Sequence, residues 1–341
     1  MSFQMQSPML VVGIGGAGSK LARRASDILE CDRLLISNDK GDLESPDGDT
    51  PQSSRSIRTM AVGTGAVINP TVGLVRAAAY ERIDAIREAI SGHPTVILMG
   101  NLAGKSGCAI CPAVSEACAA EDAKLVSFAV MPFGHEKSRL FSAGVALRRL
   151  RETSACVTVV DNDSISESNP DLSPRECYDV AEAAVMYAVD FVTRSELETG
   201  TESLLAAGRN RDSLEESLRD ALKTVYGSTS TGAIRHSVLY VAGGEDVPVG
   251  LLRSVAALAE GVLGGGGGNS VPDAQITTAE TASIQAASPD ESRVIMMSTV
   301  QGMAKFEKYD PLGAIPTDKM LDWSTPECSI DCKMPDMYQL E

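Results

Sequence analysis

The chain has few aromatic residues and few histidines. It contains six Phe, seven Tyr, one Trp and three His in 341 residues, while 43% of its residues are hydrophobic. A core of ordinary size must therefore consist mainly of Val, Leu, Ile, Ala and Met. The histidines, His93, His135 and His236, are isolated in the sequence, and no combination of Ser, His and Asp indicates a catalytic triad.

Basic residues are also scarce. The 30 Lys and Arg are outnumbered by 46 Asp and Glu, which gives a formal net charge of −16. Binding to the phosphates of nucleic acids requires a basic face, and so does electrostatic binding to anionic lipid. The charge balance therefore argues against nucleic acid as a partner and against simple electrostatic attachment to a membrane.

Long apolar runs are absent. No stretch reaches the roughly 18–20 residues of a membrane span, and the start of the chain lacks the charged region and apolar core of a secretory leader. We therefore expect a cytoplasmic protein whose eight cysteines are thiols. Cys108, Cys111 and Cys118 are close in sequence, but tetrahedral zinc needs four ligands and no histidine is near. Packing at a helix start is the favoured interpretation, and we assign no metal ligands.

Apolar segments of strand length alternate with helical patterns through the first half of the chain. Strands are predicted at 9–14, 34–36, 95–99, 125–131 and 156–160, and helices at 19–28, 72–90 and 109–120 and within 134–153. Residues 45–58 are rich in Pro, Ser, Gly and Asp and are predicted to form a loop. Strands that are apolar on both faces imply a parallel sheet covered on two sides. Ligands of such sheets bind outside the carboxyl ends of the strands.

The second half of the chain has a different pattern. We predict one long helix over 174–194 and a second over 213–225, then strands at 237–242, 274–284 and 293–300 with a helix at 249–263 and a glycine loop at 264–268. The predicted fold is therefore α/β, with a doubly wound, mostly parallel sheet domain over 1–173. A central helix and following loop (174–212), a smaller α+β domain (213–310) and an extended tail (311–341) complete the chain.

Three glycine-rich turns follow apolar strands in the first domain. They are Gly13-Ile-Gly-Gly-Ala-Gly18, Gly63-Thr-Gly-Ala-Val-Ile-Asn-Pro70 and Ala103-Gly-Lys-Ser-Gly107. Glycine lets backbone N–H groups approach a phosphate chain closely, and the three turns share one edge of the predicted sheet. The sequence therefore predicts a bound nucleotide.

Two other nucleotide motifs are partly matched. Gly13-x-Gly15-x-x-Gly18 has the spacing of a dinucleotide-binding turn, and Asp39 lies where a ribose-binding acid would follow. A nicotinamide-dependent enzyme is therefore one alternative. Gly104-Lys105-Ser106 resembles the end of a P-loop, but the upstream glycine, Gly100, is one residue too close. Lys105 could contact phosphate, or it could be a solvated loop lysine.

Taken together, these segments resemble the FtsZ/tubulin family of polymerising GTPases. The three turns resemble its phosphate loops, as does Leu35-Ile-Ser-Asn-Asp39. Pro132-Phe-Gly-His-Glu136, Val159-Val-Asp-Asn162-Asp163 and Val241-Ala-Gly-Gly-Glu-Asp246 resemble later family segments in the same order. The resemblance covers residues 8 to 305. It implies GTP or GDP as cofactor, with Mg²⁺ as a candidate second cofactor, and head-to-tail polymerisation with GTP hydrolysis at the subunit junction.

The same resemblance implies the nucleotide-binding residues. Glu136 would bind ribose, with Arg139 nearby; Tyr178 would stack on the base and Glu182 would stand near the base-reading position, with Ser19 in place of a purine-contacting Asn. The complete set is Gly15, Gly16, Ala17, Gly18, Ser19, Asp39, Ala66, Asn69, Gly104, Lys105, Ser106, Gly107, Glu136, Arg139, Asn162, Tyr178 and Glu182. The signature glycine loop is altered here, because two alanines and Lys105 replace three glycines. A divergent scaffold with altered or lost hydrolysis is therefore the main alternative.

One Asn and two acidic residues lie at the start of the helix predicted at 213–225, and we call them the acidic segment. Asn210, Asp212 and Glu215 match the spacing of the family's hydrolytic loop, which a neighbouring subunit inserts beside the nucleotide. These carboxylates could polarise an attacking water. Alternatively, Asn210 or Asp212 caps the helix and Glu215 is a first-turn acid favoured by the helix dipole. The expected partners are further copies of the chain and, through the tail, a membrane-linked adaptor, although that tail could equally be a disordered end.

Overall fold

The computed structural model describes residues 2–44, 55–65, 67, 69–168, 170–208, 213–229, 234–242, 250, 253–254, 257, 275–278 and 293–300. The strands are β1 (Ser2–Phe3), β2 (Met9–Ile14), β3 (Asp32–Ser37), β4 (Ile57–Ala61), β5 (Thr95–Asn101), β6 (Lys124–Met131), β7 (Cys156–Asp161), β8 (Leu197–Glu198), β9 (Thr201–Gly208), β10 (Ile234–Ala242), β11 (Gln275–Thr278) and β12 (Arg293–Val300). The helices are α1 (Gly15–Leu29), α2 (Val72–Tyr80), α3 (Ile83–Ile90), α4 (Lys105–Ala120), α5 (Lys137–Thr153), α6 (Asn162–Ser168), α7 (Pro174–Arg194) and α8 (Leu214–Ser228), with a 3₁₀ turn η1 (Lys40–Leu43).

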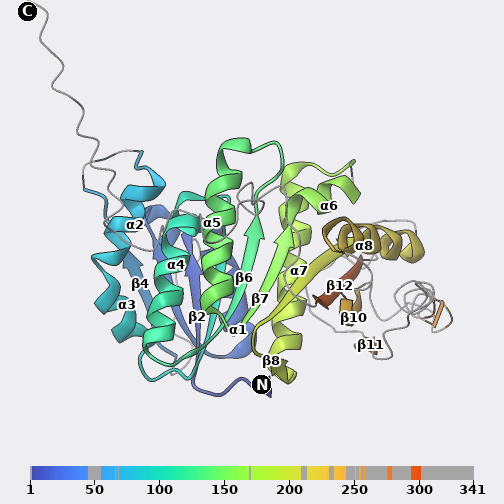
Figure 1. Cartoon of the computed structure of the whole chain (residues 1–341), viewed down its shortest axis with the longest axis horizontal. Coiled ribbons are helices and arrows are strands. Elements are labelled where there is room, and N and C mark those ends of the chain that lie inside the picture. The colour runs from blue at the N-terminus through green and yellow to red at the C-terminus, as the bar shows by residue number, and fades with distance from the viewer. Residues whose placement is uncertain are drawn as a thin grey trace, which may run out of the picture.

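One mixed sheet runs through the molecule (Figure 1). Its strand order is β11-β10-β12-β9-β7-β6-β5-β2-β3-β4. The segment from β4 to β9 is parallel throughout, whereas β12 joins β9 and β10 joins β12 in antiparallel fashion. The carboxyl ends of β2, β3, β5, β6, β7 and β9 therefore lie along one edge of the sheet, which we call the carboxyl edge. The predicted α/β fold is confirmed.

Helices cover both faces of the sheet because alternate residues of the strands are buried on opposite sides. Val11 and Leu35 pack with α1 and α7 on one face, whereas Val12 and Leu34 pack with α2, α3, α4 and α5 on the other. Continuous apolar strands of this kind are characteristic of a sheet covered twice. Helix α8 packs against β9, β10 and β12 over a third apolar cluster. Among the described residues, no helix is both long and apolar enough to cross a membrane.

Several predicted elements differ from the observed ones. The helix predicted over 72–90 is two helices, because the last turn of α2 tightens at Glu81, whose N–H bonds to the carbonyls of both Ala77 and Ala79. The loop predicted over 45–58 ends earlier, since β4 begins at Ile57 and pairs with β3 as an edge strand. Strand β9 was not predicted. The helix predicted at 249–263, the loop at 264–268 and the tail lie wholly or mostly outside the described residues.

The long helix α7 begins with a complete capping box. The Ser173 hydroxyl accepts from the Glu176 N–H, the Glu176 carboxylate accepts from the Ser173 N–H, and Pro174 opens the helix. At its far end, Tyr187 contacts Tyr240 of β10, and Phe191 contacts both Tyr240 and His236. Because β9, β12 and β10 continue the same sheet, the proposed division into two domains stays a prediction.

A buried ion pair joins α5 to β9. Arg151 donates two hydrogen bonds to the Glu202 carboxylate, from Nε to Oε2 at 2.7 Å and from an Nη to Oε1 at 2.8 Å. The two side chains are 11% and 4% exposed. A pair at this depth is satisfied only while both partners are present, since either charge alone would be buried without compensation.

We predict that Glu202→Gln lowers the free energy of unfolding by about 3 kcal/mol, because Arg151 would keep a buried charge. Urea denaturation measures this loss. The matched control is Arg219→Ala, which removes the partner of Glu216 in an exposed pair on α8 and should change stability by less than about 1 kcal/mol. Equal effects of the two variants would contradict the assignment.

Candidate nucleotide site

The first glycine turn opens α1 at the carboxyl edge. Gly15 has φ +68°, a left-handed conformation that a side chain disfavours. A Cβ at Gly18 would collide with the Met99 carbonyl oxygen of β5. The helix therefore starts directly against the end of β5, and its first N–H groups face the edge where β2 ends.

The third glycine turn is the start of a helix rather than a loop. Helix α4 begins at Lys105, four residues before the predicted position, with Gly104 as its N-cap. A Cβ at Gly107 would collide with the Asn101 carbonyl, so α4 also packs directly against the end of β5. A Cβ at Gly15 would lie 3.1 Å from Ser106 Cβ, which shows that the two helix starts are adjacent.

Both helix starts lack side-chain caps. Among the described residues, no side chain accepts a hydrogen bond at the N-cap position of α1 or α4, and neither helix has an acid in its first turn. The first N–H groups of a helix have no partner within the helix and carry a partial positive charge. Two such ends side by side form a place where an anion such as phosphate is stabilised.

Lys105 adds a full positive charge at the same point. It is the first residue of α4, where a cation is disfavoured by the helix dipole. Its ammonium donates to Asn69 Oδ1, and no carboxylate among the described residues pairs with it. Asn69 of the second glycine turn and Lys105 of the third, both predicted site residues, are thus in contact. The predicted residue Ala66 lies outside the described residues.

Ser106 ties α4 to the end of β3. Its hydroxyl lies 3.3 Å from Ser37 Oγ, accepts from the Asn38 N–H at 3.4 Å and donates to Asn38 Oδ1. Nearby Asp39 is exposed, and its carboxylate accepts the Gly41 N–H at 2.9 Å as the cap of η1. The predicted residues Ser106 and Asp39 thus lie at the carboxyl edge, but the side-chain oxygens described here already have hydrogen-bond partners within the chain.

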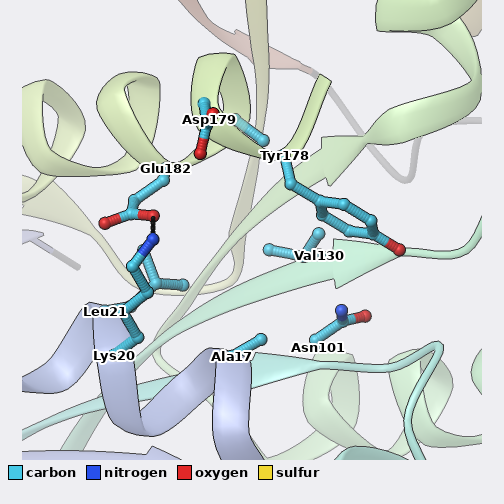
Figure 2. Close-up of a pocket in the computed structure, with 9 residues that line it drawn as sticks. Ala17, Lys20, Leu21, Asn101, Val130, Tyr178, Asp179 and Glu182 are labelled. Atoms are coloured by element: carbon cyan, nitrogen blue, oxygen red, sulfur yellow. Dashed lines mark hydrogen bonds and ion pairs between the residues drawn. The ribbon is translucent and has the colours of Figure 1, made fainter. Parts of the chain in front are cut away.

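A pocket of about 310 Å³ lies beside this point, between α1 and α7 (Figure 2). Its walls are mostly apolar, with polar groups at intervals, and its lining residues are Ala17, Lys20, Leu21, Asn101, Val130, Tyr178, Asp179, Ala181 and Glu182. Such a mixture suits a planar ring with a polar edge. The predicted residues Ala17, Tyr178 and Glu182 therefore meet in one cavity.

Glu182 is held by two cations of α1. Lys20 Nζ lies 2.6 Å from its Oε2 and Arg24 Nη1 lies 2.7 Å from its Oε1. Burial alone would raise the pKa of the Glu182 carboxyl, but the hydrogen bonds and charges of Lys20 and Arg24 outweigh burial and lower that pKa. The pocket therefore presents an ionised carboxylate with an ammonium beside it.

Tyr178 forms an aromatic part of the pocket wall, and charged residues lie near it. The Tyr178 ring meets the Phe133 ring edge to face, with centroids 5.4 Å apart. Burial raises the pKa of the Tyr178 hydroxyl, the Glu136 charge adds to the rise, and a hydrogen bond with Asn101 opposes it. Glu136 accepts from Arg139 Nη1 at 2.6 Å. The predicted ribose-binding pair is thus close to Tyr178.

Two predicted contacts lie away from the cavity. Ser19 is fully buried on α1, and its hydroxyl has no hydrogen-bond partner within the described part of the chain; the pocket is lined instead by the next residue, Lys20. Asn162 is also fully buried, where it donates to the Met131 carbonyl at 2.9 Å. Neither side chain lines the pocket.

Of the acidic segment, the described residue Glu215 lies at the same edge as the glycine turns. Because β9 runs parallel to β7, its end at Gly208 belongs to the carboxyl edge, and Gly208 packs against Ser217 of α8. Glu215 is exposed in the first turn of α8, as the dipole interpretation predicts, but the N-cap is Ser213, which accepts from the Glu216 N–H at 3.3 Å. The cap predicted at Asn210 or Asp212 is therefore wrong. Both of these residues lie outside the described ones.

Several residues that line or support the site were not predicted. Asn101 ends β5 and Asn38 directly follows β3, and a polar residue at the end of a buried strand was the available signal. The sequence predicts the purine contact at Ser19, but the residue that lines the pocket is the next one, Lys20. Among the described residues, no group of three or more His, Cys, Asp or Glu is placed to hold a metal ion. The cysteines of α4 are buried and free, and burial raises the pKa of Cys108 to about 12.

Comparison with known proteins agrees with this geometry. Residues 8–170 match the family model described as Tubulin/FtsZ family, GTPase domain. Cell division protein FtsZ 1 of Halobacterium salinarum is 28% identical over 256 residues, which cover 68% of this chain and 64% of that protein. Cell division protein FtsZ 1 of Archaeoglobus fulgidus is 26% identical over 273 residues, which cover 74% and 73%.

Solved structures show the same fold. An empty FtsZ dimer from M. jannaschii has a TM-score of 0.63 at 21% identity, with 86% of this chain and 88% of that chain covered. CetZ2 from Haloferax volcanii, in a GTPgS-bound protofilament, has a TM-score of 0.55 at 16% identity, with 88% and 94% covered.

The sheet, the helix layers and the glycine turns place the chain among α/β proteins of the tubulin/FtsZ fold. More particularly, its residues 8–170 match the tubulin/FtsZ GTPase-domain model, and the chain is similar to the archaeal cell division proteins FtsZ named above. The resemblance inferred from its motifs is confirmed.

We predict that Gly107→Ala lowers the free energy of unfolding by about 2 kcal/mol, because the added Cβ would collide with the Asn101 carbonyl. Gly104→Ala is the matched control, since its Cβ would lie 3.4 Å from the same oxygen and its φ is −87°. Urea denaturation compares the two. A neutral Gly107→Ala would show that α4 does not pack as closely as described.

Proposed function

We propose that this chain binds a guanine nucleotide, GTP or GDP, at the carboxyl edge and assembles head to tail into filaments. The observation that carries the proposal is the meeting of two uncapped helix starts with Lys105, a cation placed where the helix dipole disfavours it. A positive charge in that position is offset when phosphate oxygens lie beside it. Residues that contradict a local preference are expected at functional sites.

The rest of the ligand fits the neighbouring pocket. Tyr178 and the apolar wall would hold the base, and Glu136 with Arg139 would bind the ribose. Gly15, Gly16, Gly18 and Gly104 would let the backbone approach the phosphates, and Asn69 would act with Lys105. The family model is described as a GTPase domain, and the related CetZ2 structure is described as bound to GTPgS. These descriptions support a guanine nucleotide, with Mg²⁺ as a candidate companion.

Self-assembly is supported by the related FtsZ structure, which is described as a dimer. On this chain, large apolar side chains are exposed near the carboxyl edge: Val67 precedes α2, Leu74 lies in its first turn and Phe141 lies near the start of α5. A head-to-tail contact joins two different surfaces and so generates an open filament. In such a filament the carboxyl edge of one subunit faces the opposite edge of the next.

A specific observation favours a second candidate function, a nucleotide-binding scaffold with altered or lost hydrolysis. Glu215 lies at the carboxyl edge of its own subunit, not at the opposite edge. The segment that follows α7 lies at that opposite edge, because β9 starts there, and only residues 195–200 connect α7 to β9. Hydrolysis by Asn210, Asp212 and Glu215 beside a neighbour's nucleotide stays a prediction.

We predict that Lys105→Ala weakens GTP binding by roughly thirtyfold, which corresponds to about 2 kcal/mol for a lost hydrogen bond to a charged group. Isothermal titration calorimetry measures the change. Lys124→Ala is the control, because Lys124 is exposed at the opposite end of the sheet, where β6 begins. An unchanged affinity in Lys105→Ala would exclude its phosphate contact. Binding of NAD in place of GTP would favour the nicotinamide-dependent alternative.

Assembly and turnover are tested together by pelleting and phosphate release. We expect GTP to increase the pelleted fraction, and electron microscopy should show filaments. If the acidic segment acts on water, Asp212→Ala with Glu215→Ala abolishes phosphate release and spares GTP binding. If the scaffold function holds, phosphate release is low in the unmodified protein and does not change in the variant.

A further inference from the structure

A carboxylate from a neighbouring segment lies against the first glycine turn. Asp42 belongs to η1, which follows β3, and a Cβ at Gly16 would lie 2.6 Å from Asp42 Oδ1 and 3.2 Å from Asp42 Cγ. Gly16 is the second residue of α1. Only glycine leaves room for the carboxylate at this position. The turn that we expect to approach phosphates therefore has a carboxylate beside it.

Hydrogen bonds hold Asp42 in this place. The buried Ser37 hydroxyl donates to Asp42 Oδ2 at 2.6 Å and lies 3.3 Å from Ser106 Oγ, in the first turn of α4. Arg23 of α1 donates to the backbone carbonyl oxygens of residues 42–44 at 3.1–3.4 Å. The η1 backbone is thus fixed on α1. The carboxylate contacts one helix start and is joined to the other through a single hydroxyl group.

The helix dipole explains why this contact is favourable. Helix α1 has no side-chain cap and no acid in its own first turn. A carboxylate from outside the helix is therefore stabilised by the partial positive charge of the first N–H groups. A phosphate bound to the same N–H groups would lie close to Asp42, and like charges at such a distance repel each other. Asp42 and phosphate therefore compete for one helix start.

The Asp42 side chain can leave this place at low cost. It is half-buried, so rotation of the side chain can bring the carboxylate into water. Ser37 can then donate to Ser106 Oγ, which is already within hydrogen-bond distance, and its buried hydroxyl keeps a partner. The Arg23 hydrogen bonds go to backbone oxygens, so they are kept while the carboxylate moves.

We propose that Asp42 makes an autoinhibitory contact, in which its carboxylate lies at the start of α1 and is displaced into solvent by the phosphates of a bound nucleotide. This inference rests on the proposed nucleotide binding. It gives Asp42 an effect opposite to that of a ligand-binding residue. Removal of the carboxylate charge should strengthen binding, whereas removal of a group that contacts the ligand weakens it.

The test measures the affinities of the full chain for guanosine, GDP and GTP by calorimetry in a buffer with EDTA. Asp42→Asn keeps the size of the side chain and an oxygen that accepts from Ser37, and Asp42→Ala removes the group. Glu44→Gln is the matched control, because it removes the same charge from an exposed side chain two residues later. Circular dichroism checks that each variant is folded.

We expect both Asp42 variants to bind GDP and GTP about tenfold more tightly than the unmodified protein, because a like charge close to the phosphates is removed. Guanosine binding should change by less than about twofold, and Glu44→Gln should match the unmodified protein. Unchanged or weaker GDP binding in the Asp42 variants, or an equal gain for guanosine, overturns the inference.

The same titrations with magnesium chloride separate repulsion from metal binding. We expect Asp42→Asn to bind GDP at least as tightly as the unmodified protein under these conditions too. Weaker binding of the variant when magnesium is present would show that Asp42 holds the cation, which overturns the inference. If GDP binds equally to both proteins, the proposed function stands and only this inference fails. If no nucleotide binds to either protein, both fail.

Discussion

The close approach of two helices to the end of β5 is the constraint on which the site depends. Gly18 of α1 lies against the Met99 carbonyl, and Gly107 of α4 lies against the Asn101 carbonyl, from opposite faces of the sheet. A side chain at either glycine would push its helix outward. Because both helices start at this point without side-chain caps, their N–H groups converge at the carboxyl edge. The convergence of these N–H groups, where we propose that phosphate binds, is thus a consequence of packing.

The base pocket follows from a second feature of the same packing. With α1 fixed against β5, the exposed Lys20 and the half-buried Arg24 of this helix reach α7 and pair with Glu182. Tyr178, one turn earlier on α7, forms the neighbouring wall. The glycines that position the phosphate site therefore also position the residues that we expect to read the base. We therefore expect phosphate and base recognition to be coupled through α1.

Much of the fold follows from local sequence patterns. The bounds of β2, α7 and β12 agree with the prediction, because each is a long apolar or amphipathic segment with a clear stop. Helix α4 was predicted to start late because Gly-Lys-Ser-Gly is typical of a loop, and only contact with β5 explains its helical form. Strand β9 was missed because its small residues have no strong strand pattern. Glu215 lies at the carboxyl edge because β9, which precedes it, pairs in parallel with β7. No local sequence pattern predicts that long-range pairing.

The most direct test of this account is a series of calorimetric titrations with guanosine, GMP, GDP and GTP. If the helix starts and Lys105 hold phosphates, affinity should increase with each added phosphate, and added salt should weaken GTP binding more than guanosine binding. Guanosine that binds as tightly as GTP would contradict the phosphate site on which the account is built.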